Sequence, residues 1–246
     1  QLQIDLGQLM TRHCKTCGMS YIASNIEDAA LHQKFHAQNL GGVDLGKSFL
    51  DSDAVRKNQV WYGESGSSVV ECSRKSGTAL RHRSSNVLEL ANLELGAVDI
   101  PEKELWGTVV QPSMSNGEQA NVDRFKAYLY VRGGKCIGLC LVERISKAAR
   151  VLAPESTSTS SVKPAQSSSI LASEETDPVL LGVSRIWTSS SHRKEGIATR
   201  LLQCAQENFL YGIQVPKEQM AFSQPTESGG ALARKWFGAQ TGWHVY

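Results

Sequence analysis

One segment constrains the fold of this 246-residue chain more than any other, the stretch from Val179 to Tyr211. It begins with a mostly apolar run, Val179 to Trp187, whose composition predicts a central strand covered on both faces. Apolar residues then recur every fourth position from Ile197 to Phe209, which predicts a helix that runs to about Tyr211 and is closed by Gly212. A strand that passes through a short loop into a helix favours a fold that mixes both elements.

The loop between this strand and this helix has a pattern that suits a phosphate group. Arg193-x-x-Gly196-x-Ala198 puts small residues where a diphosphate can approach the backbone, and the free N–H groups of the helix start can hold the anion. His192 and Lys194 could add cationic contacts beside Arg193. The alternative is an ordinary turn in which glycine serves only packing. The glycine patterns of P-loop NTPases and of dinucleotide-binding folds are absent from the sequence.

Further strands flank this segment. Asp123–Val131 and Lys135–Ile145 are rich in β-forming residues, and Gly133-Gly134 between them predicts a type I′ hairpin because glycine accepts positive φ angles. A short strand over Gln219–Ser223, a helix over Gly229–Phe237 and a last strand over Trp243–Tyr246 complete the pattern. The predicted class is α+β, with a mainly antiparallel sheet flanked by helices.

Two regions are different in character. Residues 41–100 mix glycine, serine and charge, and allow no clear assignment. Between Ser156 and Ser173 there are eight serines and two threonines, a composition that buries little apolar surface. We expect a flexible insertion over about 153–178 within a domain that spans 41–246. Residues 1–40 are expected to form a separate small unit with an N-terminal extension.

That small unit carries a metal-binding pattern, Cys14-x2-Cys17-x14-His32-x3-His36. Zinc prefers four such ligands in a tetrahedron, and two histidines four residues apart project from one face of a helix. Asn25 is the expected N-cap of that helix. The alternative is an accidental match in a loop. Cys136 and Cys140 lie in a strand-like run and are interpreted as small buried hydrophobic residues.

Composition limits the partners. A net charge of +2 is too small to indicate general attraction to nucleic acid or membranes, and no apolar run approaches the ~18 residues of a membrane span. The predicted finger stands alone, and its helix begins with Glu27-Asp28, which would repel phosphate. We therefore favour a structural or protein-docking finger over strong direct DNA binding. The cysteine pattern fits a reducing compartment, and Gln1 suggests an excised fragment.

Four blocks occur in a characteristic order. They are Cys14-x2-Cys17-Gly-Met-x-Tyr21 with His32-x3-His36, Gly182-Val-Ser184-Arg-Ile-Trp187, Arg193-x-x-Gly-Ile-Ala198, and Ala221-Phe-Ser-Gln-Pro-Thr-Glu-Ser-Gly229. Together they resemble the sister-chromatid cohesion N-acetyltransferases, which belong to the GNAT superfamily of acetyl-CoA-binding enzymes. The resemblance implies a GNAT domain behind a zinc finger. It also implies acetylation of lysines on the ATPase head of the cohesin ring, in the nucleus and on chromatin.

The resemblance also implies site residues. Cys14, Cys17, His32 and His36 would bind a structural Zn²⁺, and Ser184 and Gln224 would lie in the catalytic centre. The residues that would bind acetyl-CoA are Ile186, Trp187, Thr188, Arg193, Lys194, Glu195, Gly196, Ile197, Ala198, Thr199, Thr226, Glu227 and Ser228.

The general base is left open. The acceptor lysine has an ordinary pKa near 10.4, so it must lose a proton before it attacks the thioester. Animal members of the family have Asp in the block where this chain has Gln224, and an amide cannot take a proton. Glu143 and Glu227 are the next candidates, with a solvated surface acid as the alternative for each.

Other functions stay under consideration. The chain could be a GNAT enzyme that acetylates another protein or a small amine, or a zinc-finger adaptor with an inactive domain. Gln1–Gly7 resembles the start of a sliding-clamp-binding motif but lacks the two aromatic residues that fill the clamp pocket. We interpret it as a first strand or linker, with the replication sliding clamp as an alternative partner.

Overall fold

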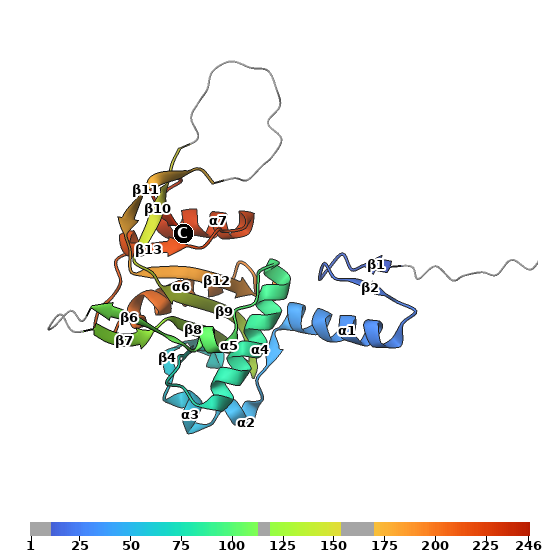
Figure 1. Cartoon of the computed structure of the whole chain (residues 1–246). Coiled ribbons are helices and arrows are strands. Elements are labelled where there is room, and N and C mark those ends of the chain that lie inside the picture. The colour runs from blue at the N-terminus through green and yellow to red at the C-terminus, as the bar shows by residue number, and fades with distance from the viewer. Residues whose placement is uncertain (1–10, 113–118, 154–169) are drawn as a thin grey trace, which may run out of the picture.

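The structure, a computed structural model, describes residues 11–112, 119–153 and 170–246. A ten-stranded sheet forms its centre, in the order β11-β10-β14-β13-β12-β9-β8-β5-β4 with β3 paired to β9 (Figure 1). Among the strands of the described residues, only the β12–β13 and β13–β14 pairs are parallel. The expected α+β class with a mainly antiparallel sheet is confirmed.

The elements have the following bounds. The strands are β1 (Thr11–His13), β2 (Ser20–Ile22), β3 (Val43–Asp44), β4 (Gln59–Tyr62), β5 (Ser68–Cys72), β6 (Thr108–Pro112), β7 (Gln119–Asp123), β8 (Phe125–Arg132), β9 (Lys135–Arg144), β10 (Lys147–Val151), β11 (Ala172–Pro178), β12 (Leu181–Thr188), β13 (Met220–Phe222) and β14 (His244–Val245). The helices are α1 (Ile26–Gly41), α2 (Lys47–Leu50), α3 (Asp53–Arg56), α4 (Thr78–Leu95), α5 (Glu102–Leu105), α6 (Ile197–Asn208) and α7 (Glu227–Phe237), with 3-10 turns η1 (Glu64–Gly66), η2 (Ser190–His192) and η3 (Lys217–Gln219).

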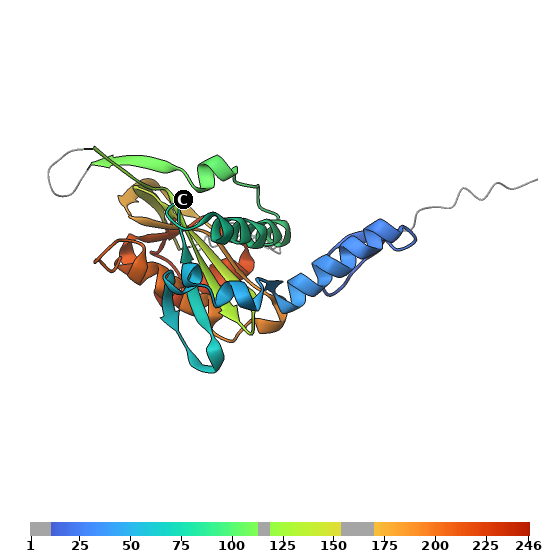
Figure 2. The same ribbon diagram turned by 90° about the horizontal axis from the view of Figure 1, so that it is seen from below.

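Strand β8 shows how the sheet divides the core into two layers. Ala127 and Leu129 join a buried cluster with residues of α4, whereas Tyr128 and Tyr130 join a second cluster with residues of α6. Successive side chains of a strand point to opposite faces, so the two helices cover opposite faces of the sheet (Figure 2). The expected β8–β9 hairpin is confirmed, with φ angles of 57° at Gly133 and 86° at Gly134.

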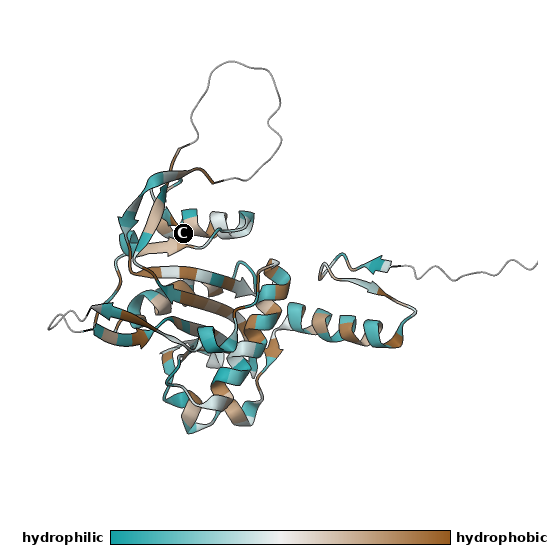
Figure 3. Cartoon of the chain, in the orientation of Figure 1, coloured by the Kyte–Doolittle hydropathy of each residue, from teal (hydrophilic) through white to brown (hydrophobic). Residues whose placement is uncertain are grey.

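Helix α4 is the main element that the sequence pattern hid. It buries Ser84 and Asn92 beside Val87, Leu88 and Ala91, so polar residues interrupt the apolar face. Figure 3 shows α4 mostly teal and white, whereas the central strands of the sheet carry brown, hydrophobic residues. Helical periodicity is therefore weak where the helix covers the sheet.

Several expected boundaries need correction. Helix α6 ends at Asn208, before the expected Tyr211, and α7 begins at Glu227 with Thr226 as its N-cap. Residues 172–178 form β11, which pairs antiparallel with β10, so the expected flexible insertion over 153–178 is wrong at its C-terminal end. Its central residues, 154–169, and the segment 1–7 lie outside the described residues.

Cys136 and Cys140 are buried in β9, as predicted, and all six cysteines are free. Within the described ranges, the structure contains no helix with the length and apolar character that a bilayer crossing demands.

Candidate functional site

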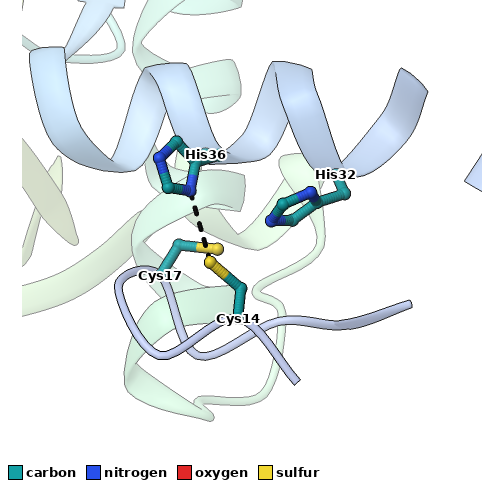
Figure 4. Close-up of side chains that lie close together, drawn as sticks. All are labelled: Cys14, Cys17, His32 and His36. Atoms are coloured by element: carbon teal, nitrogen blue, oxygen red, sulfur yellow. Dashed lines mark hydrogen bonds between the residues drawn. The ribbon is translucent and has the colours of Figure 1, made fainter. Parts of the chain in front are cut away.

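The metal-ligand residues come from two local elements. Cys14 and Cys17 lie in the turn that joins β1 to β2, and His32 and His36 lie one turn apart on α1 (Figure 4). The Asn25 side chain accepts hydrogen bonds from the N–H groups of residues 27 and 28, at 2.9 Å and 3.2 Å. The expected N-cap is thus confirmed, and it fixes where the helix that carries both histidines begins.

The four side chains fit a zinc ion. Their ligand atoms all lie within 4.8 Å of one another, and Cys14 Sγ lies 3.5 Å from His36 Nδ1. That separation matches the roughly 3.5 Å expected between S and N ligands of a tetrahedral zinc. His32 Nε2 is buried and has no hydrogen-bond partner in the part of the chain that the structure describes. A buried ring nitrogen in that state is accounted for by a metal ion among these donors.

Neighbouring groups orient one of the imidazoles and change the pKa of both thiols. Tyr21 stacks on His32, with ring centroids 3.9 Å apart, and so orients the imidazole. Hydrogen bonding from the Cys17 backbone is the largest cause that lowers the pKa of the Cys14 thiol, to about 5. Burial raises the pKa of the Cys17 thiol. One thiolate is therefore available at neutral pH before a metal arrives.

The second candidate site lies where β12 and β13 diverge. The two strands pair in parallel from Leu181 to Val183, and the Ser223 N–H still donates to the Val183 carbonyl at 3.0 Å. The pairing of β12 with β9 shifts by one residue at Ser184, which is a β-bulge. Beyond the bulge, β12 continues to Thr188 with β9 as its neighbour, whereas β13 has ended.

This divergence leaves one edge of β12 available. The Ser189 N–H donates to the Ile137 carbonyl at 3.0 Å, on the β9 side. Backbone groups alternate in direction along a strand, so those of Ile186 and Thr188 point to the other side. An extended ligand with amide groups can pair with this edge. The expected backbone role is compatible with this geometry for Ile186 and Thr188. It does not fit Trp187, whose backbone groups face β9 and whose side chain is buried.

The loop that follows β12 has the backbone shape of an anion cradle. Lys194 and Gly196 have positive φ angles of 68° and 84°. Gly196 is the N-cap residue of α6 and provides no side-chain cap, so the first N–H groups of α6 remain available. Apart from the two neighbours of Gly196 in the chain, no atom of the described residues lies within 4 Å of a Cβ built on this glycine, so the space in front of it is open. The loop residues that were expected to bind a diphosphate therefore have a backbone shape that fits one.

Two side chains of this loop are held by the protein itself. Arg193 pairs with Glu94 of α4 and donates to the Thr188 carbonyl at 3.3 Å. Glu195 forms a 2.6 Å ion pair with Arg132, whose hydrogen bond lowers the pKa of the Glu195 carboxyl. These contacts hold the loop in shape. The charge of Arg193, expected as a cation at the rim of the site, is neutralised by Glu94, whereas Lys194 is exposed.

Glu94 and Arg132 were not found by sequence reasoning. Glu94 also accepts a hydrogen bond from Trp187 Nε1, so one carboxylate holds both the strand and the loop. Glu94 lies in the region without a clear sequence pattern, and no motif marked either residue.

The remaining predicted residues lie on the far side of the divergence. Gln224, Thr226, Glu227 and Ser228 occupy the turn after β13 and the start of α7, and all are exposed. The Thr226 hydroxyl accepts a hydrogen bond from the Gly229 N–H at 3.2 Å. Because Ser223 bonds Val183, the structure brings the backbone of this turn close to the Ser184 bulge.

Glu143 lies beside the same bulge and is already partnered. Its carboxylate accepts from Arg124 at 2.8 Å and from the Tyr246 hydroxyl at 3.4 Å. The Tyr246 ring packs directly on Gly182, where an added Cβ would come within 2.5 Å of it. Burial, followed by the Glu143 charge, raises the pKa of Tyr246. Tyr246 is therefore a neutral hydrogen-bond donor. In the sequence, the one signal for its position is Gly182, because a glycine within a strand often marks a close approach by another group.

Comparison with known proteins gives two matching family models. The model described as ESCO1/2 acetyl-transferase matches residues 177–246. The model described as zinc-finger of acetyl-transferase ESCO matches residues 1–38.

Similar proteins carry related names. N-acetyltransferase eso1 of Schizosaccharomyces pombe is 34% identical over 96% of this chain and 24% of its own length. N-acetyltransferase eco of Drosophila melanogaster is 30% identical over 97% of this chain and 20% of its own length. N-acetyltransferase ECO1 of Yarrowia lipolytica is 33% identical over 97% of this chain and 72% of its own length. The chain thus spans about a quarter or less of the first two relatives.

A solved structure agrees with the fold. The xEco2 acetyltransferase domain bound to a CoA conjugate matches with a TM-score of 0.59 at 24% identity. The match covers 77% of this chain and 96% of that domain.

Proposed function

The chain belongs to the ESCO family of N-acetyltransferases, and on this premise we propose that it transfers an acetyl group from acetyl-CoA to lysines of the cohesin ATPase head. The observation that carries the proposal is the open edge of β12 beside an uncapped helix start, because together they suit an extended thioester cosubstrate with a diphosphate. The CoA conjugate in the similar xEco2 domain supports the same cosubstrate.

Acetyl-CoA supplies the acetyl thioester. The backbone of Ile186 and the N–H group of Thr188 would pair with the amides of its pantetheine arm, since the Thr188 carbonyl already accepts from Arg193. The loop from Lys194 to Thr199 would hold its diphosphate. Thr226, Glu227 and Ser228 flank the cosubstrate from the opposite side. In this proposal the thioester would lie near the Ser184 bulge, where the acceptor lysine would approach.

Ser184 and Gln224 are proposed to serve the acceptor lysine. The Ser184 hydroxyl is already near a cation, since Arg185 donates to it at 3.3 Å. It can accept a proton from the lysine only if it passes one on, for example through water. Gln224 can hold the lysine or orient that water. Of the two carboxylates considered as base, Glu143 is engaged by Arg124 and Tyr246, and Glu227 is exposed.

The finger is proposed to bind a structural Zn²⁺ rather than to take part in the chemistry. Zinc in a Cys2His2 site has no open coordination position. The family names imply a link to cohesion and hence a chromatin-associated, nuclear role. We infer that cohesin is the partner.

A panel of acceptors tests the proposal. Purified chain and acetyl-CoA are incubated with a lysine-containing peptide from the cohesin head, with the same peptide carrying arginine for lysine, and with small amines. Acetylation of the first peptide alone supports the proposal. Preferential acetylation of small amines supports the alternative GNAT activity, and acetyl-CoA binding without any transfer supports an adaptor.

A further inference from the structure

Helix α1 connects the metal centre to the cofactor loop. It carries His32 and His36 and ends beside η2, the turn that precedes Arg193 (Figure 1). The last carbonyls of a helix lack intrahelical partners and must find others. In α1 the Asn39 carbonyl accepts from Ser190 Oγ at 3.2 Å, and the Leu40 carbonyl accepts from Ser191 Oγ.

Asn39 makes a second contact with the same hydroxyl. Its side-chain oxygen lies 3.1 Å from Ser190 Oγ, and the residue is only 2% exposed. A buried amide is costly unless it is hydrogen-bonded, so this position is specified by its polar partners and not by apolar packing. Sequence patterns gave no reason to single out Asn39.

The turn itself is fixed on its other side. Ser189 is fully buried, its N–H donates to Ile137 of β9, and its hydroxyl lies 2.8 Å from His192 Nδ1. The turn is thus held between the end of α1 and the sheet. It leads directly into Lys194 and Gly196, whose positive φ angles persist only when the surroundings determine them.

We propose that Asn39 is a positioning residue for acetyl-CoA, because its bonds to Ser190 hold the turn from which the diphosphate loop starts. The inference rests on the proposed function. Asn39 touches neither the cosubstrate nor the acceptor. It acts by keeping the loop in its binding shape before acetyl-CoA arrives, so its loss lowers affinity for acetyl-CoA without altering the chemical step.

The test compares wild type with Asn39→Ala, Ser190→Ala and the double variant. Gln33→Ala, an exposed position on the same helix, is the control. Ser190→Thr keeps the hydroxyl and serves as the rescue. Melting temperature and zinc content establish that each variant is folded. Steady-state kinetics then give KM for acetyl-CoA and kcat, and amide hydrogen exchange of residues 189–196 is measured without cosubstrate.

We expect KM for acetyl-CoA to rise about fivefold in Ser190→Ala, which removes the hydroxyl from both oxygens of residue 39, and about two- to threefold in Asn39→Ala, which leaves the backbone carbonyl as an acceptor. The double variant should match Ser190→Ala, and kcat should stay within twofold in all three. Exchange should quicken in residues 189–196 but not in β8, and Ser190→Thr should restore both values. Unchanged KM and unchanged exchange in the folded single variants would overturn the inference. Equal losses in kcat, or faster exchange throughout the domain, would also overturn it.

Failure of the proposed function is distinguishable. If wild type neither binds nor uses acetyl-CoA, the proposed function fails. Exchange of residues 189–196 in that case still decides whether Asn39 holds the turn.

Discussion

The metal centre and the cofactor loop are built in different ways. All four proposed metal ligands lie within one hairpin and one helix, between Cys14 and His36. The loop is held by residues far away in sequence: Arg193 by Glu94, Glu195 by Arg132, and Ser190 by Asn39, which is 151 residues distant. A local site can be assembled by a turn and a helix alone. A loop that is held by residues distant in sequence requires the folded sheet domain, so substitutions at many positions can weaken the site.

The largest expected effect is in the loop. Gly196→Asp should weaken acetyl-CoA binding roughly 100-fold or more, because it puts a negative charge where the diphosphate lies. Gly196→Asn is the matched control, since asparagine has a similar shape without the charge and tolerates positive φ. Calorimetry should show that the asparagine variant retains much more affinity. Equal affinity for wild type and a folded Gly196→Asp variant would refute the diphosphate assignment.

Sequence signals marked the backbone of the cofactor loop more clearly than the side chains that hold the loop in place. Glycine at residue 196 and the apolar face of α6 are local signals, and spacing alone marks the four proposed zinc ligands, whose ligand atoms the structure brings together. Glu94 and Asn39 have no such signal, because their roles depend on which helix packs beside β12 and η2. The same reason explains part of α4. Its buried Asn92 accepts a hydrogen bond from Arg185 of β12, which only the completed fold brings beside it, whereas its buried Ser84 donates to the Leu80 carbonyl within the helix.

Loss of a metal ligand should lower zinc content much more than it lowers affinity for acetyl-CoA. Cys14→Ser should lower zinc content from about one per chain to well below half, because structural zinc needs its full ligand set. Affinity for acetyl-CoA should change less than threefold, since Phe35 and Asn39 anchor the second half of α1 in the domain. Metal analysis and calorimetry measure the two effects, with Lys15→Ala as an exposed control between the cysteines. If zinc content stays unchanged when each of the four ligands is substituted in turn, these residues do not form a metal site.

A smaller effect is expected at the bulge. Ser184→Ala should lower kcat about tenfold and leave acetyl-CoA affinity within twofold, because the cosubstrate is held mainly by backbone. Gln224→Glu should be tolerated, or should raise the rate at lower pH, since it adds a group that can accept a proton. If turnover is unchanged in both variants, the base lies elsewhere, and Glu143→Gln and Glu227→Gln are the next variants to measure.

The smallest effect is expected in the serine-rich segment. Replacing residues 155–168 with a short Gly/Ser linker should leave melting temperature and activity nearly unchanged, because closure entropy depends weakly on loop length. Extending the replacement to residue 175 should lower the melting temperature, since it removes much of β11 and its pairing with β10. A large loss from the first replacement would show that the segment packs or regulates; no loss from the second would show that β11 adds little stability.

Calorimetric titration of the wild-type chain with acetyl-CoA and with acetyl-pantetheine tests whether the uncapped start of α6 holds a diphosphate. Both ligands carry the thioester and the amides that pair with β12, but only acetyl-CoA carries the diphosphate. We predict one acetyl-CoA bound per chain, at least about tenfold tighter than acetyl-pantetheine. Equal affinity for the two ligands, or no binding of acetyl-CoA, would contradict the site described for β12 and α6.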